Sequence, residues 1–326
     1  MSYFPFTRPR RMRLNASIRD MVTENSLNVN DFIVPLFIEE GKNKKNEISS
    51  MPNYFRFSLD TLKKEIKEIQ SLGLKSVLLF VKVPDSKKDN SGKEALNNKG
   101  LMQQSIKLIK DIAPELYVMT DVALDPYSIY GHDGIVENQQ IINDATNEVL
   151  AEMSISHAEA GADCVAPSDM MDGRIMIIRE GLENSGFSNV GIMSYAVKYA
   201  SCFYGPFRDA LDSAPGFGDK KTYQMNPANV REALHEVLLD IEEGADIVMV
   251  KPGMAYLDVL HRVKTAVNIP VSVYQVSGEY AMIKAAAKQG WLNEDKAIME
   301  SLIAFKRAGA DLIASYFAKD AAKLLS

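Results

Sequence analysis

The stretch Gly244-Ala-Asp-Ile-Val-Met-Val-Lys-Pro-Gly253 carries the signals that decide the fold. Gly-Ala-Asp ends a helical pattern, because glycine is the usual residue just past a helix C-terminus. The four apolar residues that follow have the length and the branched side chains of a buried strand, which Lys251 closes. Gly-Ala-Asp recurs at Gly161 and Gly309, each time between a helical and an apolar stretch. The three copies therefore mark one end of a repeated helix and strand unit.

Working outward from this stretch, short β-branched runs alternate with helical patterns along nearly the whole chain. The predicted strands are Phe32–Phe37, Ser76–Val81, Leu116–Val122, Cys164–Ala166, Gly191–Ala196, Ile247–Val250, Val271–Tyr274 and Leu312–Ser315. The clearest predicted helices are Leu59–Leu72, Asn138–Ala160, Ala228–Glu243 and Glu294–Ala308. This alternation predicts the α/β class and a parallel (β/α)8 TIM barrel rather than an open sheet. Chemistry then belongs at the C-terminal strand ends, opposite the Gly-Ala-Asp copies.

The composition is that of a soluble globular protein, with 46% hydrophobic and 25% charged residues among 326. A net charge of −6 argues against nucleic acid as the main partner. No apolar run reaches the roughly 18 to 20 residues that span a bilayer, and Met1 to Arg13 has no apolar core of signal-peptide length. Two cysteines outside any CxxC pattern, Cys164 and Cys202, fit a reducing compartment. We therefore expect a cytoplasmic protein without a membrane partner.

The first residues are both basic and aromatic. Four arginines occur within six residues, after three aromatic residues: Arg8, Arg10, Arg11, Arg13, Tyr3, Phe4 and Phe6. A basic arm could bind anions or a membrane surface. The aromatic residues favour an extended arm that packs on a partner subunit. We predict an arm for subunit contacts at 1–30 and a catalytic barrel at 31–326.

Two lysines close neighbouring strands of the predicted barrel, Lys198 the fifth strand and Lys251 the sixth. A lysine at the end of a buried strand is partly desolvated, and a second cation nearby lowers its pKa further. The resulting neutral amine can attack a carbonyl. The alternative is a lysine whose stem lies along the surface with its charge in water. Two lysines in corresponding positions favour the catalytic interpretation.

Polar residues also follow the other strands. They are Asp121 and Asp125 after the third, Ser168 and Asp169 after the fourth, Ser277 after the seventh and Tyr316 after the eighth. A serine or aspartate in this position commonly caps the next helix, and a tyrosine there can serve packing alone. These residues are candidates for the site because the strand ends of a barrel surround one opening.

The segment 199–227 exceeds the about 12 to 15 residues usual for a loop without function, and loops of this length are commonly active-site lids. Glycines and aromatic residues alternate in it with Arg208, Lys220 and Lys221. An arginine can clasp a carboxylate through two hydrogen bonds, so this lid suits an anionic substrate. The alternative is a solvated basic loop.

Several long strings resemble the porphobilinogen synthase family, also called the 5-aminolaevulinate dehydratase family. The matching strings are Thr120-Asp-Val-Ala-Leu-Asp-Pro126, Val165-Ala-Pro-Ser-Asp-Met-Met-Asp-Gly-Arg174, Ser194-Tyr-Ala-Val-Lys198, Tyr204-Gly-Pro-Phe-Arg208, Met249-Val-Lys-Pro-Gly253 and Tyr274-Gln-Val-Ser-Gly-Glu279. They occur in order, and the resemblance runs from about Arg8 to the C-terminus. It implies a lyase of haem biosynthesis that condenses two 5-aminolaevulinate molecules to porphobilinogen with loss of two waters.

The resemblance also implies roles for the candidate residues. Lys251 would form a Schiff base with the substrate that becomes the propionate side, and Lys198 with the substrate that becomes the acetate side. The remaining residues would bind the substrates: Ser277 and Tyr316 the first carboxylate, Arg208, Lys220 and Gln224 the second, and Asp121 and Ser168 the substrate amine. Two paired amines agree with a reaction that activates two ketones.

The metal pattern departs from the zinc-dependent branch of the family, which carries three cysteines where this chain has Ala123, Asp125 and Asp133. Alanine cannot bind a metal, and carboxylates prefer hard cations such as Mg²⁺, so we expect no cysteine-bound catalytic zinc. Asp125 and Asp133 could hold an active-site cation. The resemblance to the magnesium-activated branch implies an allosteric Mg²⁺ site at Glu236, with Asp169 in the outer shell, and a homo-octamer whose arms embrace neighbours.

Two alternatives belong to other classes. A lysine-dependent barrel aldolase for sugar phosphates needs one Schiff-base lysine and a phosphate site after the last strands, where Ala314-Ser-Tyr-Phe317 lacks the glycines of such a site. An inactive relative that only binds its ligand would have lost one of the lysines, and both are present. Two lysines and a cationic lid favour two small carboxylate substrates.

Overall fold

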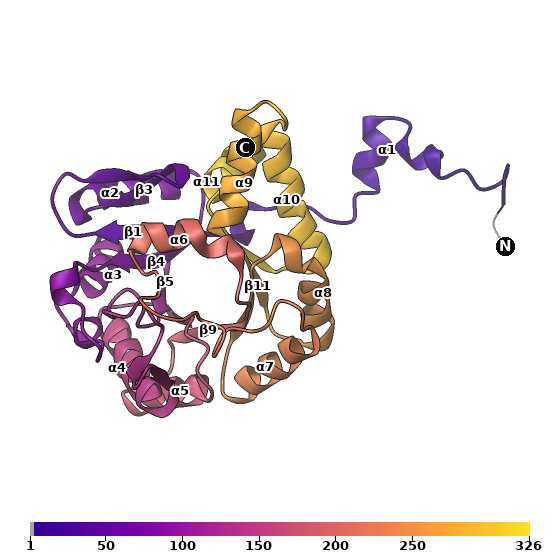
Figure 1. Cartoon of the computed structure of the whole chain (residues 1–326). Helices are drawn as coiled ribbons and strands as arrows, with labels where there is room; N and C mark the ends of the chain where they lie inside the picture. Colours follow the sequence, from indigo (N-terminus) through magenta and orange to yellow (C-terminus); the bar gives the residue numbers. More distant parts are fainter. Residues whose placement is uncertain (1–2) are drawn as a thin grey trace.

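Eight parallel strands close into a barrel in the computed structural model, which describes residues 3–326 (Figure 1). The barrel strands are β1 (Phe32–Glu39), β4 (Ser76–Lys82), β5 (Tyr117–Val122), β8 (Cys164–Pro167), β9 (Gly191–Lys198), β10 (Ile247–Lys251), β11 (Val271–Gln275) and β12 (Leu312–Ser315). The last strand pairs with the first, with Phe32 opposite Ile313. The predicted (β/α)8 barrel is confirmed, and every predicted strand is found with its ends within two residues.

Helices surround the barrel and bury their apolar sides against the strands (Figure 1). They are α2 (Leu59–Ser71), α3 (Leu101–Ile112), α4 (Asn143–Glu159), α5 (Arg174–Asn184), α7 (Arg231–Glu242), α8 (Leu257–Ala266), α9 (Ser277–Lys288), α10 (Glu294–Ala308) and α11 (Ala318–Leu325). The prediction for α10 is confirmed at both ends. No helix in the described part of the chain has the length and apolar character needed to cross a membrane.

Two hairpins were missed by the sequence analysis. One consists of β2 (Lys45–Ile48) and β3 (Met51–Phe57), and β3 continues the sheet beside β1. The other, β6 (Ile135–Glu137) and β7 (Gln140–Ile142), occupies the start of a stretch predicted as helix from Asn138. Asn138 and Gln139 adopt positive φ angles of 50° and 61° in the turn between them. A left-handed turn is incompatible with a continuous helix, so that prediction was wrong for its first residues.

The Gly-Ala-Asp copies lie at the N-terminal end of the barrel, as predicted. Their glycines follow α4, α7 and α10 with φ angles between +102° and +110°, a conformation that favours glycine: Gly161, Gly244 and Gly309. Each aspartate accepts the backbone N–H of a residue in the preceding strand at 2.7 Å and pairs with a cation of an outer helix. The three sets are Asp163 with Val118 and Lys110, Asp246 with Ile192 and Arg179, and Asp311 with Val271 and Lys264.

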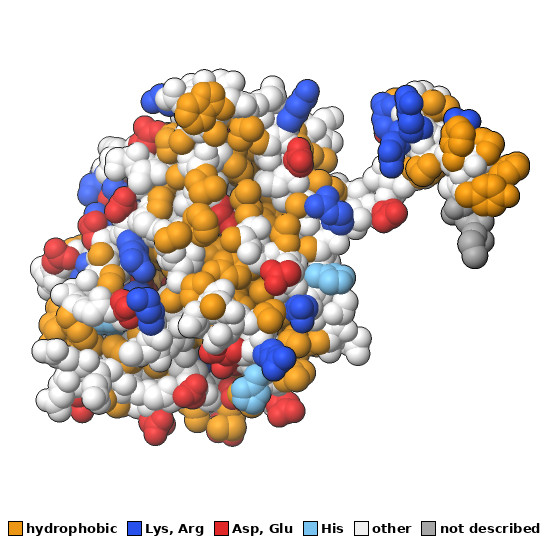
Figure 2. Space-filling view, turned by 45° about the vertical axis from the view of Figure 1, so that its right-hand side comes forward, with side chains coloured by type: hydrophobic (Ala, Val, Ile, Leu, Met, Phe, Trp, Pro, Cys, Tyr) orange, Lys and Arg blue, Asp and Glu red, His pale blue; other side chains and the backbone are white. Residues whose placement is uncertain are grey.

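The N-terminal arm extends away from the barrel (Figures 1 and 2). It contains a 3₁₀ turn, η1 (Pro9–Arg13), and a short helix, α1 (Ala16–Met21), and neither buries a residue. Its aromatic side chains are exposed, with Phe4 71% accessible. The arm predicted at 1–30 thus has the exposed apolar surface that a partner-binding arm needs, although residues 1 and 2 lie outside the described part.

Candidate active site

Lys198 and Lys251 stand opposite each other at the C-terminal ends of β9 and β10. The pairing shifts by one residue just before them, from Val248 with Ser194 to Val250 with Val197. This β-bulge matters because side chains alternate between the two faces of a strand. Tyr195 points into the barrel, where its ring lies 5.0 Å from Lys251 Nζ. Lys198 comes three residues later and faces the barrel interior beside Lys251 only because the bulge restores the inward direction.

The Lys251 side chain is 5% exposed and lies among aromatic rings. Its Nζ is 4.7 to 5.3 Å from the ring centres of Tyr195, Tyr204, Phe207 and Tyr274. Burial first, and the positive charge of Lys198 second, lower the pKa of Lys251 from 10.5 to about 7. A large share of this amine is therefore neutral at neutral pH and available as a nucleophile.

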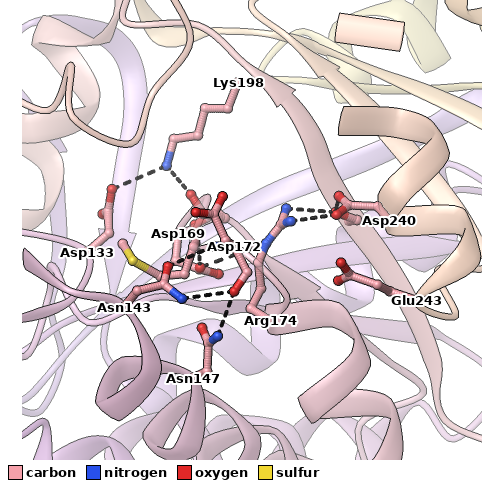
Figure 3. Close-up of polar contacts among 12 residues, drawn as sticks. Asp133, Asn143, Asn147, Asp169, Asp172, Arg174, Lys198, Asp240 and Glu243 are labelled. Carbon is pink, nitrogen blue, oxygen red and sulfur yellow. Dashed lines mark hydrogen bonds and ion pairs between the residues drawn. The ribbon is translucent and has the colours of Figure 1, made fainter. Parts of the chain in front are cut away.

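Lys198 has a different environment although it is equally buried, at 6% exposed. Its Nζ donates a hydrogen bond to the backbone carbonyl of Ser168 and lies 3.7 Å from Asp133 Oδ2 (Figure 3). Two oxygens thus lie close to this amine, whereas aromatic rings surround the amine of Lys251. The two lysines therefore differ in electrostatic environment at the same strand level.

Three carboxylates come from β5 and the loop that follows it. Burial first, and then the charge of Asp125, raise the pKa of Asp121 to about 7. Asp125 and Asp133 flank the ammonium of Lys220, whose Nζ is 3.4 Å from Asp125 Oδ2 and 3.1 Å from Asp133 Oδ1. The position considered for an active-site cation is thus occupied by a lysine side chain. Among residues 3–326, no three His, Cys, Asp or Glu side chains form a metal-binding group.

The segment 199–227 covers this end of the barrel, as expected of a lid. It begins with η5 (Cys202–Tyr204) and α6 (Gly205–Leu211), and α6 lies over the rim of the opening against β4 and α9 (Figure 1). The sequence analysis missed α6, although Pro206 stands in its first turn, where proline favours a helix start. One cavity beneath the lid is lined by Asp125, Lys198, Tyr204, Phe207, Arg208, Lys220, Gln224 and Lys251.

This cavity unites both lysines with three of the predicted substrate-binding residues, Arg208, Lys220 and Gln224. Two others lie behind its wall. Ser277 Oγ accepts the backbone N–H of Phe207 at 2.9 Å and so holds α6 in place. The Tyr316 hydroxyl accepts a 3.0 Å hydrogen bond from Tyr274. Neither side chain lines the cavity, and each is one contact away from a ring that faces Lys251.

Asp169, predicted as an outer-shell partner of Glu236, is fully buried beside Arg174 (Figure 3). Its Oδ1 accepts the N–H of Met171 at 2.7 Å and is 3.8 Å from Arg174 Nε. Burial raises the pKa of Asp169 to about 6. Arg174 also forms a 2.6 Å ion pair with Asp240 on α7, the helix that carries Glu236. Arg174 therefore stands between the two predicted residues.

Glu236 is half-buried on α7 and lines an open pocket that also contains Glu232 and Asp172. Burial raises its pKa, Arg174 opposes that change, and the charges of Asp240, Asp172 and Glu232 add to it. Negative charge thus gathers on this wall of the pocket. A hard cation held by one carboxylate and several waters would suit such a wall.

The sequence analysis missed the side chains that set the environment of Lys251. The inward-facing Tyr274 could have been found from strand alternation at the C-terminal end of β11, whereas the bulge in β9 makes a simple count place Tyr195 on the wrong face. Glu279 entered the sequence analysis only as the last residue of a matching string. Its carboxylate is buried and accepts the N–H groups of Met254 and Val276 at 2.7 and 2.9 Å. It thereby fixes the loop that follows Lys251, a role that no local sequence signal reveals.

The chain is similar to known proteins along nearly its whole length. A profile of the family described as delta-aminolevulinic acid dehydratase matches residues 6–324. The delta-aminolevulinic acid dehydratase of Halalkalibacterium halodurans is 51% identical over 98% of this chain and 97% of its own. That of Bacillus subtilis is 50% identical over 98% of both chains. The Toxoplasma gondii enzyme, solved in complex with the reaction product porphobilinogen, has a TM-score of 0.97 and 48% identity, covering 99% of this chain and 92% of its own.

Proposed function

The chain belongs to the delta-aminolevulinic acid dehydratase family, and from that premise we propose that its lid-covered cavity condenses two 5-aminolaevulinate molecules to porphobilinogen. The enzyme is a lyase of tetrapyrrole and haem biosynthesis, and the joining of the two substrates releases two waters. The observation that carries the assignment to this cavity is the pair of buried lysines in register, Lys198 and Lys251.

Lys251 is the amine that we assign to the substrate of the propionate side. Its neutral form attacks the keto carbon, a C–N bond forms, and the carbonyl oxygen leaves as water. The aromatic rings around Nζ stabilise the resulting protonated imine through their electron-rich faces. The carbon of this imine is electrophilic and accepts the new C–C bond, whereas the carbon that loses a proton and attacks it lies next to the imine of the acetate-side substrate on Lys198. Lys198 holds the substrate of the acetate side as a Schiff base in the same way.

The remaining residues bind and orient the two substrates. Arg208, Lys220 and Gln224 point into the cavity, where two cations and an amide suit the carboxylate of the acetate-side substrate. Asp121 and Ser168 contact the substrate amine, and a carboxyl with a pKa of about 7 can exchange a proton at neutral pH. Ser277 and Tyr316 bind the other carboxylate once their hydroxyls turn from Phe207 and Tyr274.

We assign an activating Mg²⁺ to Glu236, because the negative charge gathered on this pocket wall favours a hard cation. The ion would supply positive charge near α7 and takes no part in the bond-forming steps. A cation at Asp125 and Asp133 would have to replace the ammonium of Lys220, which makes Glu236 the favoured site. A cysteine-bound catalytic zinc is not expected, because the zinc-branch cysteines are replaced by Ala123, Asp125 and Asp133.

The assembly that we infer is a homo-octamer in which the exposed arm of one subunit packs on another. The apolar side chains of the arm, left uncovered in one chain, support this assignment. Cytoplasmic localisation is inferred from the two free thiols, Cys164 and Cys202, which fit a reducing compartment. Neither a membrane nor a nucleic acid is proposed as a partner.

The experiment that tests the function measures pyrrole formation from 5-aminolaevulinate by metal-stripped protein, with Mg²⁺ and then Zn²⁺ restored. We expect activation by Mg²⁺ and indifference to Zn²⁺. Glu236→Ala should remove the Mg²⁺ response and leave basal turnover, whereas Glu242→Ala, an exposed control on the same helix, should behave like the wild type. Absence of pyrrole under every metal condition would refute the proposed activity. A normal Mg²⁺ response in Glu236→Ala would refute only the metal assignment.

A further inference from the structure

We propose that His132 is a positioning residue that latches the lid loop, the segment 212–230 between α6 and α7, over the active site. His132 is 2% exposed and follows β5, and its imidazole is not among the residues that line the cavity with the lysines. Its kinetic consequence rests on the function proposed above. The hydrogen bonds that form the latch do not depend on that function and are tested separately.

Each hydrogen bond of the His132 imidazole has a defined donor and acceptor. Its Nε2 is 3.1 Å from the backbone carbonyl of Phe217, which can only accept, so Nε2 carries the proton and donates. Nδ1 is then the bare nitrogen and accepts the hydroxyl proton of Tyr223 at 3.0 Å. The Tyr223 oxygen in turn accepts the backbone N–H of Asp133 at 3.3 Å. One neutral imidazole thus connects two points of the lid loop to the loop after β5.

Backbone packing beside His132 supports the same contact. The N–H of Gly216 donates to the carbonyl of Tyr130 at 2.8 Å. Gly131 has a φ angle of +63°, and a Cβ built there would lie 2.2 Å from the backbone oxygen of Ala214. The ring of Phe217 packs on the imidazole with centroids 4.6 Å apart. The lid loop therefore approaches the segment 130–132 so closely that a side chain at position 131 would separate them.

The latch matters because its two attachment points, Phe217 and Tyr223, stand on either side of Lys220. Between them Lys220 Nζ reaches Asp133, the residue next to His132, at 3.1 Å. Holding both flanks confines Lys220 to the cavity wall, where its ammonium is placed for a substrate carboxylate. Without the latch, the lid loop would detach from the loop after β5, and Lys220 would move out of the cavity together with the lid loop. His132 therefore acts through Lys220 rather than on the reacting atoms.

Two measurements test the latch on the full-length protein. The first is limited proteolysis with trypsin, because Lys221 in the lid loop is exposed and is cut once the loop detaches. His132→Asn and Tyr223→Phe should each be cut faster, by about tenfold for the loss of buried hydrogen bonds, and the double variant little faster than either. The second is steady-state kinetics, in which the KM for 5-aminolaevulinate should rise by about tenfold with a smaller fall in kcat.

Matched variants separate the latch from general damage. His261→Asn changes an exposed histidine on α8 and should leave both readouts unchanged. Gly131→Ala should open the loop without touching the imidazole. Gly290→Ala, with a similar φ of +74° and no atom near the added methyl, should not.

The possible outcomes either support or overturn the latch. Unchanged cleavage in both His132→Asn and Gly131→Ala would overturn it. A loss of kcat with normal KM and normal cleavage would instead place His132 in the chemical steps. If the wild type forms no pyrrole, the proposed function fails, and the proteolysis still decides whether the latch exists.

Discussion

Replacing Lys251 by methionine should abolish turnover and at the same time stabilise the fold. The structure gives the amine no hydrogen-bond acceptor within residues 3–326, and burial lowers its pKa from 10.5 to about 7. At pH 7 the unfolded chain carries a fully protonated lysine, whereas the folded chain must bury either an ammonium or a neutral amine. With about 1.36 kcal/mol for each tenfold step in proton affinity, the folded state loses about 4 kcal/mol of stability. Methionine has a similar length and removes this loss.

The stability difference between Lys251→Met and the wild type should change with pH in a defined direction. Below pH 7 the lysine is protonated in both states, and the destabilisation is complete. Between pH 7 and 10.5 only the unfolded state holds the proton, so the destabilisation shrinks as pH rises, and above 10.5 it vanishes. Guanidinium unfolding of wild type and Lys251→Met should therefore show a stability difference of about 4 kcal/mol at pH 7 and a much smaller one near pH 10.

Lys288→Met, which removes an exposed lysine on α9, serves as the control and should leave stability unchanged at every pH. The reasoning is refuted if Lys251→Met is less stable than the wild type at pH 7. A gain that does not change with pH would also contradict it, because such a gain would come from apolar packing rather than from the proton.

The neighbouring lysine should respond in the opposite direction. Lys198→Met removes the hydrogen-bond donor of the buried Ser168 carbonyl and the ion pair with Asp133, and it should destabilise the fold by about 1 to 3 kcal/mol in the same unfolding assay. If this variant is more stable than the wild type, the contacts of Lys198 with Ser168 and Asp133 do not compensate for the burial of its side chain. At the bottom of the barrel, Gly309→Ala should lower the thermal midpoint more than Gly290→Ala does. Both glycines have positive φ, but only at Gly309 would the new Cβ lie 2.7 Å from a neighbouring side chain, that of Lys264.

The repeating part of the fold could be predicted from the sequence because it depends on local chemistry. Strands were found from apolar runs and helix ends from glycine, and the start of α10 follows from Asn293, whose side chain accepts the N–H of Lys296. The two lysines were found because a charged residue directly after an apolar strand is unusual. Their opposition in space was expected from the neighbouring parallel strands that carry them.

What the sequence analysis missed depends on contacts between distant segments. The rings around Lys251 come from β9, η5, α6 and β11, and Glu279 acts on a loop 25 residues away. The hydrogen bonds of His132 reach 85 and 91 residues along the chain. No periodicity encodes such distances. The hairpin before α4 was misassigned because its left-handed turn uses an asparagine and a glutamine rather than the glycine that would have marked it.

The bulge in β9 changes which spacing along the chain places two side chains on the same face of the strand. Tyr195 and Lys198 both face inward although three positions separate them, a spacing that an unbroken strand would place on opposite faces. Deleting or inserting one residue between Ser194 and Lys198 would direct the lysine toward the surrounding helices, whatever that residue was. We therefore expect evolution to substitute side chains in this stretch far more freely than to change its length.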